Sequence, residues 1–207
     1  MNLGQIVTVN VDFLNTPTIF VLSFLKIWFH KILIDMDLQT LLDDKSVKPK
    51  EKTELIGQLL IDQKLSISDL IKFAQFAKDP IKGTCIESIE FATRVDPTIA
   101  TNECLEFVSS SLLAKAPRVK WESARVIGNI AHLFPESLDS AINNLLVNTE
   151  HIGTVVRWSA AFALGAIIQT HTPQKTELIT TIRSICEREE KNSIRKIYIT
   201  AIKRAEK

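Results

Sequence analysis

From residue 37 onward, apolar residues recur at intervals of three and four positions, the spacing of one face of an α-helix. In the first such segment the apolar positions are Leu55, Ile56, Leu59 and Leu60. Short polar breaks, often marked by proline, separate this segment from the next ones. The pattern predicts helices over 50–63, after Ser66, and over 80–94, 97–114, 117–133, 135–148, 153–170, 173–190 and 192–205.

The predicted helices form pairs, and the second helix of a pair carries an apolar stripe. In the helix over 173–190 the stripe consists of Leu178, Ile179, Ile182, Ile185 and Cys186. The helix over 135–148 carries a similar stripe of Leu138, Ala141, Ile142, Leu145 and Leu146. A single pair cannot bury all its apolar surface, so several pairs must stack to form a core.

An internal repeat supports this stacking. The segment Val119–Gly128 returns as Val156–Gly165, and Pro97, Pro135 and Pro173 stand 38 residues apart. A period of this length is typical of repeat proteins that stack helix pairs.

Local signals suggest where the helices begin. We expect Pro97, Pro135 and Pro173 each in the first turn of a second helix. Backbone N–H groups of the first turn have no acceptor within the helix, so the N–H that proline lacks is not needed there. Asp96 and Thr172 stand directly before two of these prolines and are predicted caps. Ser66 is predicted to cap the next helix, with Asp69 three positions later.

The repeated segment also predicts how neighbouring repeats meet. Trp121, Ala124 and Gly128 share one helix face, as do Trp158, Ala161 and Gly165. Small residues allow a neighbouring helix to approach closely, and the indole covers the remaining space. We therefore interpret this face as a contact between repeats, with a base-stacking platform as the alternative.

The segment Val156–Gly165 resembles the VRxxAAxALG opening helix of HEAT-like repeats, in particular the short bilin-lyase-type repeats, and Val119–Gly128 is a weaker copy. The resemblance covers residues 80–205, and 37–79 by extension. It implies an all-α, right-handed α-solenoid of about four antiparallel helix pairs plus a terminal helix. Such repeats serve as scaffolds, adaptors, nucleic-acid binders and a few enzymes.

Residues 1–35 differ from the predicted repeat domain over 36–207. The run over 19–34 is strongly apolar but contains Lys26, His30 and Lys31, which disfavour a membrane span. Asp12 precedes the run and bulky residues follow it, which disfavours a signal peptide. Since Met36 opens an ordinary helical sequence, we expect 1–35 to be a misassigned upstream extension or a loosely attached apolar segment.

Composition agrees with one helical domain. The chain has 207 residues, 45% hydrophobic and 24% charged, with a net charge of +1, so any attraction to nucleic acid or membrane must be local. Cys85, Cys104 and Cys186 lie in apolar helical patterns and show no metal-binding spacing, so we expect buried free thiols and no metal. A reducing cytoplasm fits this cysteine usage.

A basic ladder is the most regular polar feature. Lys82, Lys120, Arg157 and Arg195 are spaced by 38, 37 and 38 residues, so stacking would align them along one edge. Such a ladder could track phosphates or an acidic peptide. The favoured interpretation is structural, in which these cations bond loop carbonyls or an acidic neighbour in the next repeat.

Further charges gather at both ends of the repeats. The C-terminal stretch is basic, which suits a solvated end cap or, alternatively, an acidic partner or nucleic acid. Acidic residues flank the first clear repeat and could orient a polar partner, and a solvated face explains them nearly as well. The basic residues are Lys191, Arg195, Lys196, Lys203, Arg204 and Lys207; the acidic ones are Glu87, Glu90, Glu103 and Glu106.

The predicted function is non-catalytic protein–protein interaction through a concave face formed by the second helices, with an unidentified protein or peptide as partner. Nucleic-acid binding is the first alternative. The partner-binding candidates are Asn102, Glu106, Ser109, Asn143, Asn144, Asn148, Thr180 and Thr181. The nucleic-acid candidates are Lys120, Arg157, Arg195, Lys196, Lys203 and Arg204.

An enzyme of the HEAT-fold DNA-repair or lyase type is the second alternative. No phosphate loop, nucleophile elbow or zinc-binding histidine spacing occurs, so no catalytic residue or cofactor is predicted. His132, His151 and His171 lack the spacing of metal ligands. Such an enzyme would require an open cleft with a buried carboxylate beside an aromatic residue.

Overall fold

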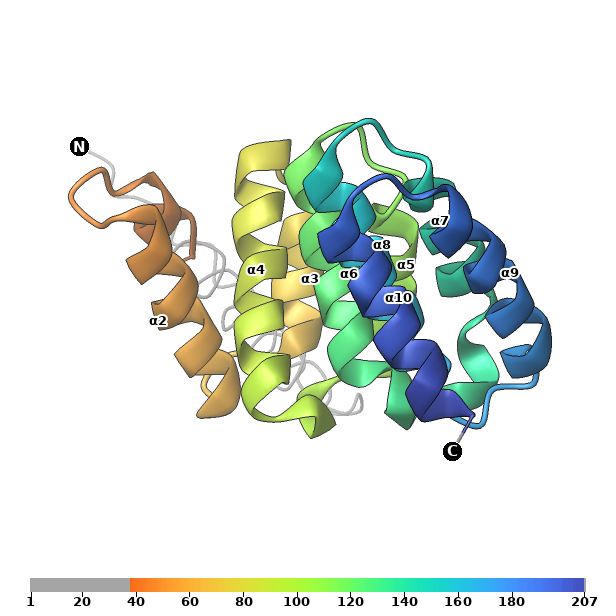
Figure 1. Ribbon diagram of the computed structural model, residues 1–207. Coiled ribbons are helices and arrows are strands. Elements are labelled where there is room, and N and C mark those ends of the chain that lie inside the picture. Colours follow the sequence, from red (N-terminus) through yellow and green to blue (C-terminus); the bar gives the residue numbers. More distant parts are fainter. Residues whose placement is uncertain (1–37, 207) are drawn as a thin grey trace, which may run out of the picture. The chain divides into compact units, whose positions relative to one another are not determined.

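The computed structural model describes residues 38–206, shown in colour in Figure 1, so the expectations for 1–35 lie outside the described residues. The chain divides into two units, Met1–Leu38 and Gln39–Lys207. The second unit contains the helices α2 to α10. Between residues 38 and 206 no strand occurs, and helices of about three turns follow one another with short connections.

The helix boundaries follow the predicted order. They are α2 (Pro49–Ile61), α3 (Ile67–Phe76), α4 (Asp79–Val95), α5 (Asn102–Ser111), α6 (Pro117–Ile130), α7 (Asp139–Thr149), α8 (Thr154–Ile167), α9 (Lys175–Arg188) and α10 (Asn192–Ala205). Short 3₁₀ turns, η1 (Pro97–Ile99), η2 (Ala131–Leu133) and η3 (Pro135–Ser137), lie in the connections.

The helices form two layers. The first layer contains α2, α4, α6, α8 and α10, each in contact with the next (Figure 1). The second layer contains α3, α5, α7 and α9, and each of these helices packs against the first helix of the following pair. This arrangement is the all-α solenoid of stacked helix pairs that the repeat predicted.

The three periodic prolines lie before the second helices, and the prediction that they occupy the first helical turn is wrong. Pro97 and Pro135 open η1 and η3, and Pro173 lies in the turn before α9. After η1 the backbone at Ala100 is extended, so the helix must start anew. Periodic proline therefore marks the connection within a repeat.

The caps explain these new starts. As predicted, the Ser66 side chain accepts a hydrogen bond from the backbone N–H of Asp69 and begins α3. Asp96 caps only the short turn η1, and Thr101, which was not singled out, caps α5. Thr172 does not cap α9, because the helix begins three residues later at Lys175, and its N-cap residue Gln174 forms no side-chain cap.

The predicted stripes form the core between the layers. Leu138, directly before α7, and Ala141 and Leu145 of α7 are fully buried, and Ile182 of α9 is fully buried as well. Tyr198 of α10 is the largest fully buried side chain of the described core. The burial of these positions confirms that the 3.6-residue periodicity identified the faces that neighbouring repeats cover.

Glycines set the distance between first helices. Gly57 of α2 faces Phe91 of α4, and a Cβ at Gly57 would lie 2.5 Å from Phe91 Cδ1. Gly128 of α6 faces Phe162 of α8 in the same way, and an added Cβ there would overlap the ring. Phe162 in turn stacks on Trp158, with ring centroids 5.9 Å apart. An aromatic ring of one first helix thus fills the notch, meaning the space beside the glycine, on the preceding first helix.

We expect Gly128→Ala to be unfavourable only while Phe162 is present. Overpacking costs about 1–3 kcal/mol, whereas alanine gains about 1 kcal/mol of helix propensity over glycine. In a Phe162→Ala background the same change should therefore stabilise the protein. Urea unfolding of the four proteins of this double-mutant cycle measures the coupling between the two positions. Equal effects of Gly128→Ala in both backgrounds would show that Phe162 does not fill the space beside Gly128.

Candidate interaction surfaces

A groove crosses the second layer between α3 and α5. This α3–α5 groove has a volume of about 610 Å³. Phe107 is buried in it, and Leu113 is exposed at its edge. The lining residues are Gln75, Lys82, Glu103, Glu106, Phe107, Ser110, Ser111, Leu113 and Ala114. The groove therefore combines apolar contact area with hydrogen-bond donors and acceptors.

The charges of the α3–α5 groove differ in how they are paired. Glu103 accepts a hydrogen bond from the Ser68 hydroxyl of α3 and is half-buried. Glu106 is exposed, and neither it nor Lys82 forms an ion pair within residues 38–206. One carboxylate and one ammonium group thus remain open to a ligand.

The other predicted partner-binding residues fall into two groups. Asn102, Asn143 and Thr180 are exposed on the second layer. The hydroxyls of Thr180 and Thr181 donate to carbonyls of their own helix. Asn144 donates from Nδ2 to the Ser109 carbonyl, 2.9 Å away on α5, and this bond holds two repeats together.

Ser109 and Asn148 are buried, so they do not belong to the exposed row proposed for them. Asn148 Nδ2 donates to the Leu112 carbonyl at 3.0 Å, and its Oδ1 accepts from Lys120 Nζ at 2.9 Å. Lys120 also donates to the Leu112 carbonyl. These bonds satisfy a carbonyl at the end of α5 that the helix leaves open.

Two rungs of the basic ladder are used within the fold. Burial lowers the pKa of Lys120, whose bonds tie α6 to α5 and α7. Arg157 donates to the carbonyls of His151 and Ile152 and makes a two-pronged pair with Glu189, at 2.9 and 3.2 Å. The Glu189 hydrogen bonds raise the pKa of Arg157. Arg195, the last rung, is exposed.

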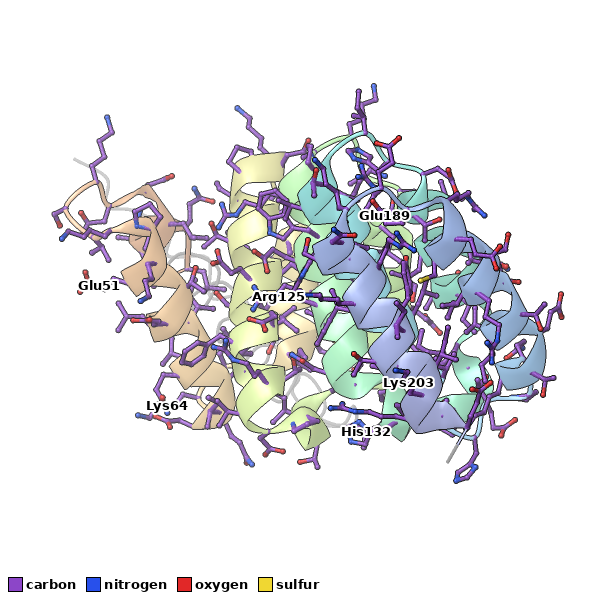
Figure 2. All side chains as sticks on the ribbon, viewed as in Figure 1. Glu51, Lys64, Arg125, His132, Glu189 and Lys203 are labelled. Carbon is purple, nitrogen blue, oxygen red and sulfur yellow. The ribbon has the colours of Figure 1, made fainter. Side chains whose placement is uncertain are left out.

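A buried polar seam between α4 and α6 was not recognised as such in the sequence. Arg125, labelled in Figure 2, pairs with Glu90 of α4 at 2.8 Å and with Glu122 of its own helix at 3.1 Å. Both carboxylates are only 5% exposed, so the interpretation of Glu90 as part of a solvated face is wrong. The 35-residue step from Glu90 to Arg125 is close to the repeat length of 37–38 residues, which is the signal that the sequence offers.

The seam also orients Trp121. Its indole N–H donates to Glu122 Oε1 at 2.6 Å, so this tryptophan is held by a carboxylate as well as by packing. Burial raises the pKa of Glu122, although the Trp121 hydrogen bond and the Arg125 charge lower it. A buried carboxylate beside an aromatic ring is what an enzyme would require. Neither Glu122 nor Trp121 lines the grooves at Glu106, Lys196, Glu189 and Leu65 in the described part of the chain.

Arg195, Lys196, Lys203 and Arg204 lie on α10, where Lys203 is labelled in Figure 2, and Lys207 lies outside the described residues. Lys196 and Arg204 line a second groove, between α8 and α10, whereas Arg195 and Lys203 are exposed outside it. Glu206 pairs with Arg183 of α9.

The three cysteines are free and buried, as predicted. Burial raises the pKa of the Cys85 and Cys104 thiols to about 12 each, which makes them poor nucleophiles. Within residues 38–206 no group of three or more candidate ligands gathers to hold a metal ion. In the same range no helix has the length and apolar character needed to cross a membrane.

No protein-family model matches the chain, and no curated protein matches it. Among solved structures, it is similar to a designed armadillo repeat protein in complex with the peptide (KR)4, at 15% identity and a TM-score of 0.64, covering 81% of this chain and 79% of that one.

A computationally designed armadillo repeat protein for modular peptide recognition matches at 15% identity with a TM-score of 0.61, covering 81% and 80%. An engineered protein matches at 15% identity with a TM-score of 0.58; 84% of this chain is covered, but only 48% of that one. These likenesses establish a helical-repeat solenoid, and the HEAT-like assignment remains a prediction.

We expect Arg157→Ala to destabilise the protein by about 3–5 kcal/mol, because it leaves Glu189 buried without a cation and two carbonyls without a donor. Arg188→Ala is the matched control. It removes an exposed pair with Glu150 and should cost at most about 1 kcal/mol. Urea unfolding compares the two, and equal losses would show that the Arg157 pair has no special role.

Two glutamates should affect stability with opposite dependence on pH. Because the folded-state pKa of Glu122 is raised above 4.5, its ionisation costs stability as pH rises from 4.5 through that pKa. Although burial opposes it, bonds from Arg157 and the Lys191 N–H lower the pKa of Glu189, so its contribution is present above pH 4.5 and lost on acidification.

As pH rises from 3.5 to 7, the free energy of unfolding of Glu122→Gln should therefore increase relative to that of the wild type. Over the same range the free energy of unfolding of Glu189→Gln should decrease relative to that of the wild type. Unfolding curves across this range measure both differences. The same sign for both variants would contradict the assignment.

Proposed function

We propose that this chain is a non-catalytic protein-interaction module that binds an extended segment of a partner protein along its second helix layer. The observation that carries the proposal is the α3–α5 groove, about 610 Å³ in volume, with Glu106 and Lys82 unpaired beside the apolar Phe107 and Leu113. A volume of this order accommodates several side chains of a bound peptide.

The chemistry of the groove suits a peptide backbone. Gln75 and Ser110 supply amide and hydroxyl groups that can bond main-chain N–H and C=O groups of a ligand. Glu106 would favour a lysine or arginine side chain, and Lys82 an acidic one. Since α3 and α5 are already ordered by the stack, binding would cost little conformational entropy in the module itself.

The fold likeness agrees with this proposal. One of the similar designed proteins is in complex with a peptide, and another was designed for modular peptide recognition. The nucleic-acid alternative gains no comparable support, because Lys120 and Arg157 bond within the fold.

Capture of binding proteins from extracts of the native cells tests the proposal. The wild-type chain is compared with Ser110→Trp, which fills the groove, and with Glu106→Arg, which reverses its open charge. Partners bound at this groove should be retained at least tenfold less by both variants. Binding to the chain should be quantified by mass spectrometry.

Glu54→Arg on α2 is the control, since it reverses an exposed carboxylate of the first layer. It should leave capture unchanged. If every captured protein is retained equally by the wild type and both groove variants, the α3–α5 groove is not the binding surface. Circular dichroism confirms that each variant is folded.

A further inference from the structure

A second groove lies in the other layer, between α8 and α10. This α8–α10 groove has a volume of about 560 Å³. The two helices approach closely where Gly165 faces Ala201, because a Cβ on Gly165 would lie 3.1 Å from the alanine Cβ. Ala166 and Thr200 are also small, so the surface above this contact is hollow. Phe162 and Ile197 add apolar area to the lining.

The charge of this groove is one-sided. Lys196 and Arg204 line it, and no carboxylate does. Neither cation forms an ion pair with any residue in the described range. Elsewhere in the first layer the partly buried arginines are neutralised: Arg118 by Glu87, Arg125 by Glu90 and Glu122, and Arg157 by Glu189.

The two cations also have a defined spacing. They are eight residues apart on α10, which corresponds to about 12 Å along a helix. Apolar and small side chains lie between them. Beyond Phe162 the apolar surface continues onto Trp158, which is 39% exposed and stacked on that ring. Exposed tryptophan beside a groove is typical of residues that dominate binding energy.

We propose that the α8–α10 groove is a second docking surface, which binds an acidic amphipathic helix of a partner protein. Apolar residues of that helix, spaced by three and four, enter the hollow above Gly165. Acidic residues about two turns apart pair with Lys196 and Arg204. This site is independent of the α3–α5 groove, because it lies in the other helix layer.

A displayed library of 18-residue amphipathic helices, randomised at the apolar stripe and at the flanking charged positions, is the probe. It is selected on the full-length chain. Enriched peptides should carry Asp or Glu about seven or eight positions apart. Their affinity, measured by fluorescence anisotropy, should fall at least tenfold for Lys196→Glu/Arg204→Glu and for the groove-filling Thr200→Trp.

The chain itself offers a matched control. Arg195→Glu/Lys203→Glu reverses two cations on the same helix that do not line the groove, and it should change the affinity less than twofold. Glu106→Arg should also leave binding unchanged, which separates this site from the proposed peptide groove. Thermal unfolding of each variant confirms that the fold is intact.

Four outcomes would overturn the proposal. These are the absence of enriched peptides, enrichment of basic ones, equal loss of affinity in both charge-reversal pairs, and unchanged affinity in Thr200→Trp. A labelled single-stranded DNA that displaces the peptides, and whose own binding is weakened equally by all four reversals, would assign this surface to nucleic acid instead.

Discussion

Successive first helices of this protein pack so closely that Gly57, Gly128 and Gly165 leave little room for a side chain at the contact. At two of these places an aromatic ring from the next helix fills the notch, and at the third a small residue lies opposite. The first layer therefore has a fixed spacing from repeat to repeat. Since each second helix packs against the first helix of the following pair, this spacing determines the second layer as well.

Polar side chains complete the joints that close packing begins. Arg125 connects one repeat to another through a carboxylate, and Lys120 and Arg157 do so through carbonyls that follow the preceding second helix. Asn144 and Asn148 form such bonds between second helices. Such bonds are directional, and breaking one would leave a buried polar group unsatisfied. They therefore fix the register of neighbouring repeats, which apolar contacts alone would allow to slide.

Both grooves arise where this general scheme changes locally. The α3–α5 groove lies between second helices, and its open charges remain because Glu106 and Lys82 find no partner within the described residues. At Gly165 a small residue, Ala201, lies opposite in place of a ring, so α8 and α10 approach closely and the small side chains leave a groove on the surface above the contact.

The sequence by itself determined the helical class, the pairing of helices and the buried stripes, because periodicity and repeat length are local properties that survive in any stacked arrangement. It did not determine where the second helices start: the extended backbone after η1 and the cap at Thr101 override the proline signal.

Only the tertiary structure decided which polar residues are available for binding. Lys196 and Arg195 are neighbours with similar charge, and so are Arg204 and Lys203, yet one of each pair lines a groove. Glu90 and Asn148 look like surface residues in the sequence but are buried and bonded to a neighbouring repeat. The exposure of such a residue depends on what the neighbouring repeat places against it, which is a long-range property that no local pattern encodes.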